Sequence, residues 1–228
     1  MQKIDSQLNN IIEILNKYSI NYFIDSGTLL GIIRDQKLID NDLDIDISIL
    51  DNEIVKFEKV QKVLLEKGYK QRELKFNNLL YKIKFEHLNE RRFIDINIFR
   101  ENKLKSIFWC PQPVPYFKTN KNYSKFNWKS IIVLYFNYIK KYLNSSTLTD
   151  APWKWGFNHF TWVIPNTFFN NFDIYKLGMK TPHNPEKYLD LRYGDWKKPS
   201  KNWDFIFDDK GLSKNNPNFY INNIKNEI

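Results

Sequence analysis

The sequence has one cysteine, Cys110, and three histidines, His87, His159 and His183. A single cysteine excludes an internal disulfide and is typical of a reducing compartment. The histidines are too scattered to form a zinc site with Cys110, so we expect no zinc centre. The content of 7 glycines and 9 prolines in 228 residues argues against a low-complexity or collagen-like chain.

Long hydrophobic runs are also missing. The first residues, MQKIDSQLNNIIEILNK, contain no continuous apolar stretch, so we expect no signal peptide. No run reaches the roughly 18 apolar residues of a membrane-spanning helix. The most apolar stretch, SIIVLYFNYIKKYL, is too short and carries two lysines. These absences predict a cytoplasmic protein.

The composition supports a packed domain, with 42% hydrophobic and 17% aromatic residues. The formal net charge is +9, from 35 basic and 26 acidic residues. A positive balance indicates an anionic partner, such as nucleotide phosphates, nucleic acid or a membrane surface, or it serves solubility alone. Because we find no RNA-binding motif and no concentrated basic helix, we expect no nucleic-acid partner.

The first hundred residues alternate between helical and strand patterns, which predicts an α+β fold with an α/β-like core. We expect a mixed sheet flanked by helices. The predicted helices cover residues 5–18, with Asp5 or Ser6 as cap, residues 26–33, with Ser26 as cap, and residues 52–69, ended by Gly68; the predicted strands cover 21–25, 42–49, 69–75, 78–87 and 92–99.

The composition changes near residue 100. The alternating prolines of CPQPVPYF exclude a regular helix or a central strand. A basic, aromatic stretch follows over 118–143, and the tail has one clear helix signal, NPEKYLDLRYG. We predict a catalytic core over 1–100 and an aromatic-rich C-terminal elaboration over 101–228, packed together as one structural unit.

The segment DNDLDIDISI places aspartates at every second position. On a strand, Asp42, Asp44 and Asp46 would share one face, with Leu43, Ile45 and Ile47 packed on the other. Carboxylates about 6 Å apart repel by roughly 3 kcal/mol per pair at an effective dielectric near 20. A bound Mg²⁺, Mn²⁺ or Ca²⁺ removes this penalty, whereas the alternative is an exposed edge with solvated aspartates.

A second strand, RRFIDINIF, carries a lone carboxylate, Asp95, among apolar residues. If it pairs beside 42–49, Asp95 joins the acidic cluster; otherwise a buried salt bridge would satisfy it. The segment Ser26-Gly27-Thr28 opens a helix, where backbone N–H groups and hydroxyls can bind a phosphate, although Gly27 also suits an ordinary tight turn. Arg34 lies about two turns further on, within reach of phosphate oxygens.

The segment GTLLGIIRDQKLIDNDLDIDISI resembles the signature of the LicD/fukutin family, a branch of the nucleotidyltransferase superfamily. The segment TPHNPEKYLDLRYGDWKKP is similar to the closing motif of that family, and RRFIDINIF lies where its third carboxylate strand belongs. The resemblance spans about residues 10–200. It departs at Asp35, where the family has histidine, and at Asp40-Asn41, where it has Pro-Trp.

The resemblance implies a nucleotidyltransferase-type fold and an enzyme of the phosphotransferase class. The implied reaction moves a phospho-alcohol, such as phosphocholine or an alditol phosphate, from a CDP-linked donor to a sugar hydroxyl of a surface glycan or lipid-linked sugar, releasing CMP. It implies Mg²⁺ or Mn²⁺ held by Asp44, Asp46 and Asp95, with Asp42 assisting and Asp95 as proton acceptor. The candidate substrate or nucleotide contacts are Ser26, Gly27, Thr28, Arg34, Arg192 and Tyr193.

Two other functions stay open at this point. A nucleotidyltransferase moving an NMP from an NTP would use the same carboxylates, and a non-catalytic polyanion-binding protein would explain the +9 charge. A predicted helix from Trp128 to Tyr142 either packs on the core or contacts an anionic membrane through Lys129, Lys140 and Lys141. Four aromatic residues either stack on a sugar or nucleobase or fill the core: Trp153, Trp155, Phe157 and Trp162.

Overall fold

The computed structural model describes residues 5–115, 157–200, 203–215, 217, 219 and 220. The predicted helix at 128–142, the basic stretch proposed for membrane contact, Trp153 and Trp155 lie outside these residues. The elements are α1 (Ser6–Lys17), β1 (Tyr22–Ile24), α2 (Ser26–Asp35), β2 (Asp44–Leu50), α3 (Ile54–Glu66), β3 (Lys70–Phe76), β4 (Leu79–Glu86), β5 (Phe93–Asn102), β6 (Ile107–Pro115), β7 (Phe157–Pro165), β8 (Phe172–Ile174), β9 (Lys180–Pro182), α6 (Pro185–Tyr193), α7 (Phe205–Asp208) and β10 (Leu212–Ser213).

The local sequence signals account for most element ends. Asp5 caps α1 by accepting from the N–H groups of Gln7 and Leu8. Gly68, with φ +89, follows the end of α3, and α6 begins at Pro185 and ends before Gly194. The predicted cap of α2 is wrong, because Asp25 rather than Ser26 caps that helix and accepts the Ser26 N–H at 2.7 Å.

The strands form one eight-stranded sheet in which the long strand β5 joins two parts. The first half of β5 pairs parallel with β2 and antiparallel with β4, giving the order β1–β2–β5–β4–β3. Its last residues, Arg100 to Asn102, pair antiparallel with β6, which continues to β7 and β10. The fold is therefore α+β with a mixed sheet flanked by helices, and the sheet crosses the domain boundary predicted at residue 100.

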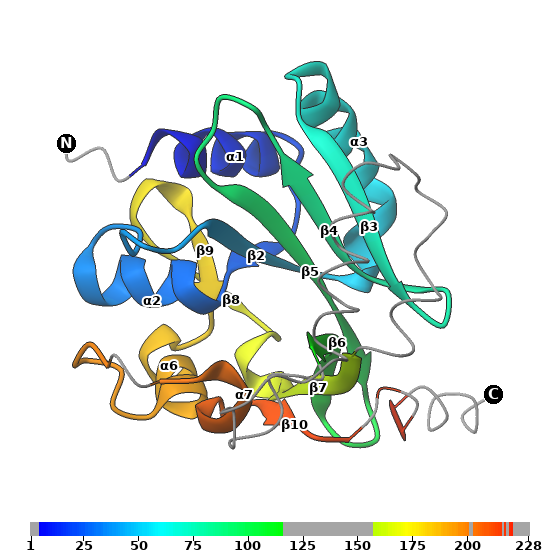
Figure 1. The fold of residues 1–228 in the computed structure, drawn as a ribbon, viewed down its shortest axis with the longest axis vertical. Helices are drawn as coiled ribbons and strands as arrows, with labels where there is room; N and C mark the ends of the chain where they lie inside the picture. The colour runs from blue at the N-terminus through cyan, green and yellow to red at the C-terminus, as the bar shows by residue number, and fades with distance from the viewer. Residues whose placement is uncertain (1–4, 116–156, 201–202, 216, 218, 221–228) are drawn as a thin grey trace, which may run out of the picture.

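The two faces of the first sheet part differ in chemistry. The alternating isoleucines of β2 and β5 are fully buried on one face, where Phe57 of α3 contacts Phe85 of β4 at a centroid distance of 6.3 Å. The opposite face carries Asp46, Asp95 and Asn97, because alternate residues of a strand point to opposite sides. Figure 1 shows α1 and α3 at one end of the molecule and α6 and α7 at the other, with α2 between them.

The proline-rich segment forms part of β6, a strand that the sequence did not predict. Over Ile107–Trp109, β6 has β5 on one side and β7 on the other; over Pro111–Pro115, its only strand partner in the described chain is β7. Alternate N–H groups of an antiparallel strand point to alternate sides. Prolines at every second position therefore leave the ladder to β7 intact by facing the side without a partner, as edge strands permit.

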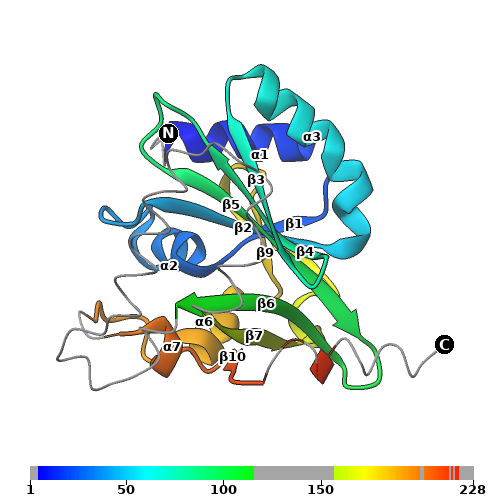
Figure 2. The same cartoon turned by 45° about the vertical axis from the view of Figure 1, so that its right-hand side comes forward.

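The C-terminal elements return to the N-terminal core. Lys180 of β9 donates to the backbone oxygen of Ile20, and Tyr22 of β1 donates to the backbone oxygen of Gly178. In Figure 2, β6 and β7 lie below β2 and β5, with α6 and α7 beside them at the lower left. Within the described part of the chain, no helix is long and apolar enough to cross a membrane.

Candidate functional site

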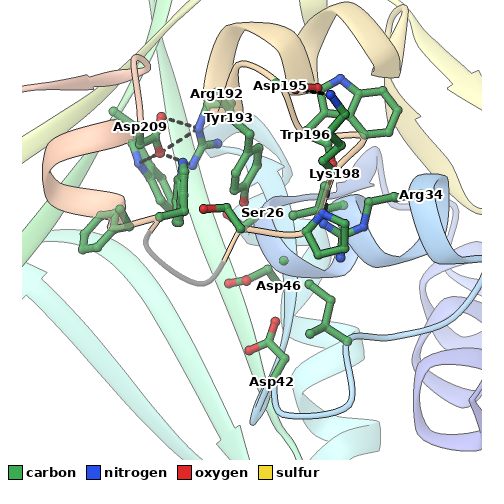
Figure 3. Close-up of a pocket in the computed structure, with 18 of the residues that line it drawn as sticks. Ser26, Arg34, Asp42, Asp46, Arg192, Tyr193, Asp195, Trp196, Lys198 and Asp209 are labelled. Carbon is green, nitrogen blue, oxygen red and sulfur yellow. Dashed lines mark hydrogen bonds and ion pairs between the residues drawn. The ribbon is translucent and has the colours of Figure 1, made fainter.

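A cavity of about 630 Å³ lies between the polar face of the sheet, the start of α2 and the C-terminal elements. The core contributes Ser26, Gly27, Arg34, Asp42, Asp46 and Lys82, and the C-terminal part contributes Arg192, Tyr193, Trp196, Trp203 and Phe205. Figure 3 shows Asp42 and Asp46 on one side of this cavity and Arg192, Tyr193 and Trp196 on the opposite side. The cavity is thus acidic at one wall and aromatic at the other.

Three of the predicted metal ligands converge at the acidic wall. Carboxylate oxygens of Asp44, Asp46 and Asp95 all lie within 4.8 Å of one another. The parallel pairing of β2 with β5 causes this, because Asp46 is the register partner of Asp95. Opposite oxygens around Mg²⁺ are about 4.2 Å apart at bond lengths of about 2.1 Å, so three oxygens within 4.8 Å of one another need to approach by only about 0.6 Å to share a hard divalent cation. Oδ1 of Asp95 is buried and accepts no hydrogen bond in the described residues, and the Lys84 ammonium lies 3.4 Å from it.

The electrostatics of the cluster also favour a cation. Burial, and then repulsion from Asp44, raises the pKa of Asp46 well above its usual value. Burial and a side-chain hydrogen bond to Asp44 raise the pKa of Asp42 to about 7. For both groups burial is the main cause and the neighbouring Asp44 carboxyl the second, and a divalent cation bound at this wall would favour the ionised forms.

Asp95 behaves differently from its neighbours. Burial alone would raise its pKa, but the ammonium groups of Lys82 and Lys84 outweigh this effect and lower it. Their nitrogens lie 2.9 and 3.4 Å from the Asp95 oxygens. A carboxylate held by two cations is a weak base, so this geometry argues against the predicted role of Asp95 as proton acceptor and favours a role as ligand.

Sequence reasoning missed Lys82 and Lys84. The signal was present, because the strand LLYKIKFE alternates like the acidic strand and both lysines share one face. What the sequence did not reveal is the pairing of β4 with β5, which sets Lys84 opposite Asp95 and Lys82 opposite Asn97.

Asp42 does not take the position predicted for it. β2 begins at Asp44, so Asp42 lies before the strand, and Leu43, predicted to pack on the core, is 56% exposed. Asp42 is not part of the three-carboxylate group; its carboxylate lies against Gly27 instead. The place beside Gly27 that the sequence analysis gave to a phosphate is thus taken by a carboxylate.

The hydroxyl groups of Ser26 and Thr28, at the start of α2, have different surroundings. Ser26 lines the cavity, and its buried Oγ has no hydrogen-bond partner among the described residues. Thr28 is 1% exposed, and its Oγ1 accepts the backbone N–H of Asp46 at 2.8 Å. Thr28 therefore holds β2 in place, and its geometry does not support the predicted contact with substrate.

Arg34 lies on the wall of the cavity, as a phosphate contact requires. Its guanidinium makes two hydrogen bonds to Asp35, at 2.9 and 2.7 Å, and a long one of 3.5 Å to the backbone oxygen of Trp196. Asp35, which stands where the resembling family has histidine, thus orients Arg34.

Arg192 and Tyr193 both line the cavity but make different contacts. The ring of Tyr193 packs on Trp203 at a centroid distance of 4.6 Å. The side chain of Arg192 is 1% exposed and bridges two buried carboxylates, with nitrogens 3.3 Å from Asp25 and 2.7 Å from Asp209. Figure 3 shows the bonds from Arg192 to Asp209. This pairing gives Arg192 a structural role that its motif did not reveal.

The buried network around Arg192 joins the two parts of the chain. Asp25, at the start of α2, accepts hydrogen bonds from Ser48 of β2 and Tyr188 of α6, at 2.7 and 2.8 Å. Asp209 accepts from the indole of Trp162 in β7, at 3.1 Å. Trp162, considered as a stacking residue, is 5% exposed and lies under the Arg192 guanidinium. The network sets the C-terminal wall of the cavity against the core.

Comparison with protein families agrees with this architecture. Residues 19–130 match the family described as LicD/FKTN/FKRP, nucleotidyltransferase domain. This segment contains α2 and the two strands, β2 and β5, that carry the three converging carboxylates.

Two curated relatives come from Rickettsia. The uncharacterized protein RT0683 of Rickettsia typhi is 34% identical over 113 residues, which are 49% of this chain and 34% of the relative. The uncharacterized protein RP689 of Rickettsia prowazekii is 32% identical over 101 residues, which are 42% of this chain and 38% of the relative. The chain thus spans little more than a third of the length of these relatives.

Two of the solved structures that match belong to the antibiotic-resistance factor ANT(2'')-Ia. Its solution structure has a TM-score of 0.35 at 13% identity, covering 64% of this chain and 77% of that one. A crystal structure of ANT(2'')-Ia with adenylyl-2''-tobramycin has a TM-score of 0.34 at 15% identity, covering 65% and 81%.

Proposed function

The chain belongs to the LicD/FKTN/FKRP family, whose nucleotidyltransferase domain covers residues 19–130, and on this premise we propose that it is a metal-dependent phosphotransferase. The proposed reaction moves a phospho-alcohol from a CDP-linked donor to a sugar hydroxyl of a glycan or lipid-linked sugar. The acceptor oxygen bonds to the phosphorus of the phospho-alcohol, the bond from that phosphorus to CMP breaks, and the hydroxyl proton is released.

One observation carries the proposal. Three carboxylates from two neighbouring strands, Asp44, Asp46 and Asp95, converge beside a cavity of about 630 Å³. Carboxylates in this arrangement hold the divalent cations of phosphoryl-transfer enzymes. A volume in this range suits a small-molecule ligand of nucleotide size.

The metal we propose is Mg²⁺ or Mn²⁺, held by these three aspartates. When bound, it supplies neutralisation of the charge that develops on the transferring phosphoryl group. Asp42 is proposed as a neighbour of this site that hydrogen-bonds to Asp44, rather than as a ligand.

Other side chains of the cavity would bind and orient the donor. The Arg34 guanidinium, steadied by Asp35, offers a fixed cationic donor for phosphate oxygens. The buried Ser26 Oγ offers a hydroxyl that a phosphate can satisfy. The pair of Tyr193 and Trp203 offers an apolar surface for a base or sugar ring.

The test is donor consumption. The protein is incubated with CDP-, UDP- and GDP-linked donors and with NTPs, in Mg²⁺ or Mn²⁺, with and without glycan acceptors, and the products are separated by ion-exchange chromatography. Release of CMP from a CDP-alcohol is expected, and Asp46→Asn, with its ligand oxygen replaced, should abolish it.

Two other outcomes would overturn the proposal. Pyrophosphate released from an NTP would instead identify a nucleotidyltransferase, an activity that the same carboxylates and the name of the matched domain also support. No product from any donor with any acceptor would favour a protein that binds polyanions without catalysis.

A further inference from the structure

Lys82 places a cation in the acidic wall, where it contacts Asp95 and also lines the cavity. Its side chain is 16% exposed, and its ammonium donates to Oδ2 of Asp95 at 2.9 Å. The same residue lines the cavity, together with Asp46 and Ser26. Within the described chain, the Lys82 ammonium uses one of its three N–H donors in the hydrogen bond to Asp95. Because Lys82 lines the cavity, its remaining donors are available to a ligand bound there.

Lys84 provides a natural comparison. It lies two residues further along β4, on the same face, and its ammonium is 3.4 Å from Oδ1 of Asp95. Lys84 is not among the residues that line the cavity, and its ammonium lies 4.3 Å from the centroid of the Phe93 ring. The two lysines therefore share the contact with Asp95 but not the access to the cavity.

From this difference, and resting on the proposed function, we propose that Lys82 contacts a phosphate oxygen of the nucleotide donor while it fixes the orientation of Asp95. The bond of Lys82 fixes Oδ2 of Asp95, while Oδ1 accepts no hydrogen bond in the described residues and has the Lys84 ammonium 3.4 Å away, so the Lys82 ammonium can hold the ligand carboxylate and the donor together. Lysine suits this role because its ammonium is a compact point charge with several donors.

A simpler role would be charge balance alone. Three aspartates whose carboxylate oxygens lie within 4.8 Å of one another need positive charge nearby, and both lysines provide it. In that case replacing either lysine would have the same effect, because each lies within 4.0 Å of the same carboxylate. The comparison of the two positions therefore separates a phosphate contact from simple neutralisation.

The experiment measures binding, not turnover. Wild type, Lys82→Met and Lys84→Met are titrated with Mn²⁺ alone and then with CDP and UDP in saturating Mn²⁺, by isothermal calorimetry. Loss of a hydrogen bond to a charged group corresponds to about tenfold or more in affinity. We expect Lys82→Met to weaken binding of the nucleoside diphosphate by about that factor relative to Lys84→Met, and Lys82→Arg to recover part of the loss.

The outcomes are distinct. If wild type binds a nucleoside diphosphate and the two methionine variants bind it equally, Lys82 only balances charge and this inference is overturned, while the proposed function stands. If wild type binds neither nucleotide at millimolar concentration, the proposed donor and this inference both fail. Should Lys82→Met not fold, as judged by circular dichroism, Lys82→Gln and Lys82→Arg provide the same comparison against Lys84→Gln and Lys84→Arg.

Discussion

The carboxylate of Asp42 lies so close to Gly27 that a Cβ at position 27 would be 2.2 Å from its Oδ2. An alanine here would force the Asp42 side chain to move. The neighbouring Gly31 is required by the approach of backbone, because a Cβ there would be 2.6 Å from the oxygen of Lys37. Gly27 thus leaves room for the Asp42 side chain in the acidic wall, and Gly31 leaves room for the backbone of the loop after α2.

Alanine at these two positions should therefore have different effects. Gly27→Ala should displace the Asp42 carboxylate and lower turnover by about 100-fold, as a shift of about 1 Å near reacting groups does. Gly31→Ala should instead lower the free energy of unfolding by about 1–3 kcal/mol through overpacking. Urea unfolding and donor turnover, measured on both variants, check this. A Gly27→Ala protein with wild-type turnover would show that the position of Asp42 does not matter.

Replacing Arg192 should lower the free energy of unfolding, in addition to any effect on substrate binding. Arg192→Met leaves Asp25 and Asp209 buried without their shared cation, and breaking a buried ion pair from one side costs about 3–5 kcal/mol. The free energy of unfolding in urea measures the loss. If Arg192→Met is as stable as wild type and loses donor affinity instead, Arg192 contacts the substrate, as its motif predicted.

Asparagine substitutions in the acidic cluster should have different effects on stability at Asp46, which is repelled by Asp44, and at Asp95, which is paired with two lysines. Asp46→Asn removes a carboxyl group that suffers from its neighbours, so the metal-free Tm should not fall, while the Tm increase with Mn²⁺ should disappear. Asp95→Asn leaves Lys82 and Lys84 without their carboxylate and should cost about 1–3 kcal/mol.

Thermal melts in EDTA and in Mn²⁺ test both statements about the acidic cluster. A wild type whose Tm is the same in EDTA and in saturating Mn²⁺ would contradict the metal site itself. An Asp95→Asn variant as stable as wild type would contradict the structural importance of the two ion pairs.

Cys110 should report global unfolding. Its side chain is fully buried in β6, and burial raises the pKa of its thiol to about 11. The thiolate is the reactive form, so the folded protein should not react with Ellman's reagent at pH 8, whereas the unfolded protein should react fully. Absorbance at increasing urea, compared with circular dichroism, checks this. Rapid reaction without denaturant would place Cys110 in a part that opens locally.

Much of the core was decided by local sequence. Apolar residues at helical spacing, together with Asp5 and Gly68, predicted α1 and α3, because caps and periodicity act over a few residues. The alternation of Asp44 and Asp46 with Ile45 and Ile47 predicted a strand with one acidic face. The same pattern supported the metal hypothesis, since like charges on one face need a counter-charge.

Only the tertiary structure decided which groups meet. The pairing of β2 with β5 and of β5 with β4 brought Asp46, Asp95 and Lys82 together, and strand order does not follow from the pattern within each strand. The motif predicted that Arg192 contacts substrate, whereas the structure shows it buried between Asp25 and Asp209. Its burial depends on the packing of α6 against residues distant in the sequence. Periodicity determines the face on which a side chain lies; long-range packing determines its neighbours on that face, and here those neighbours set the charge of the site.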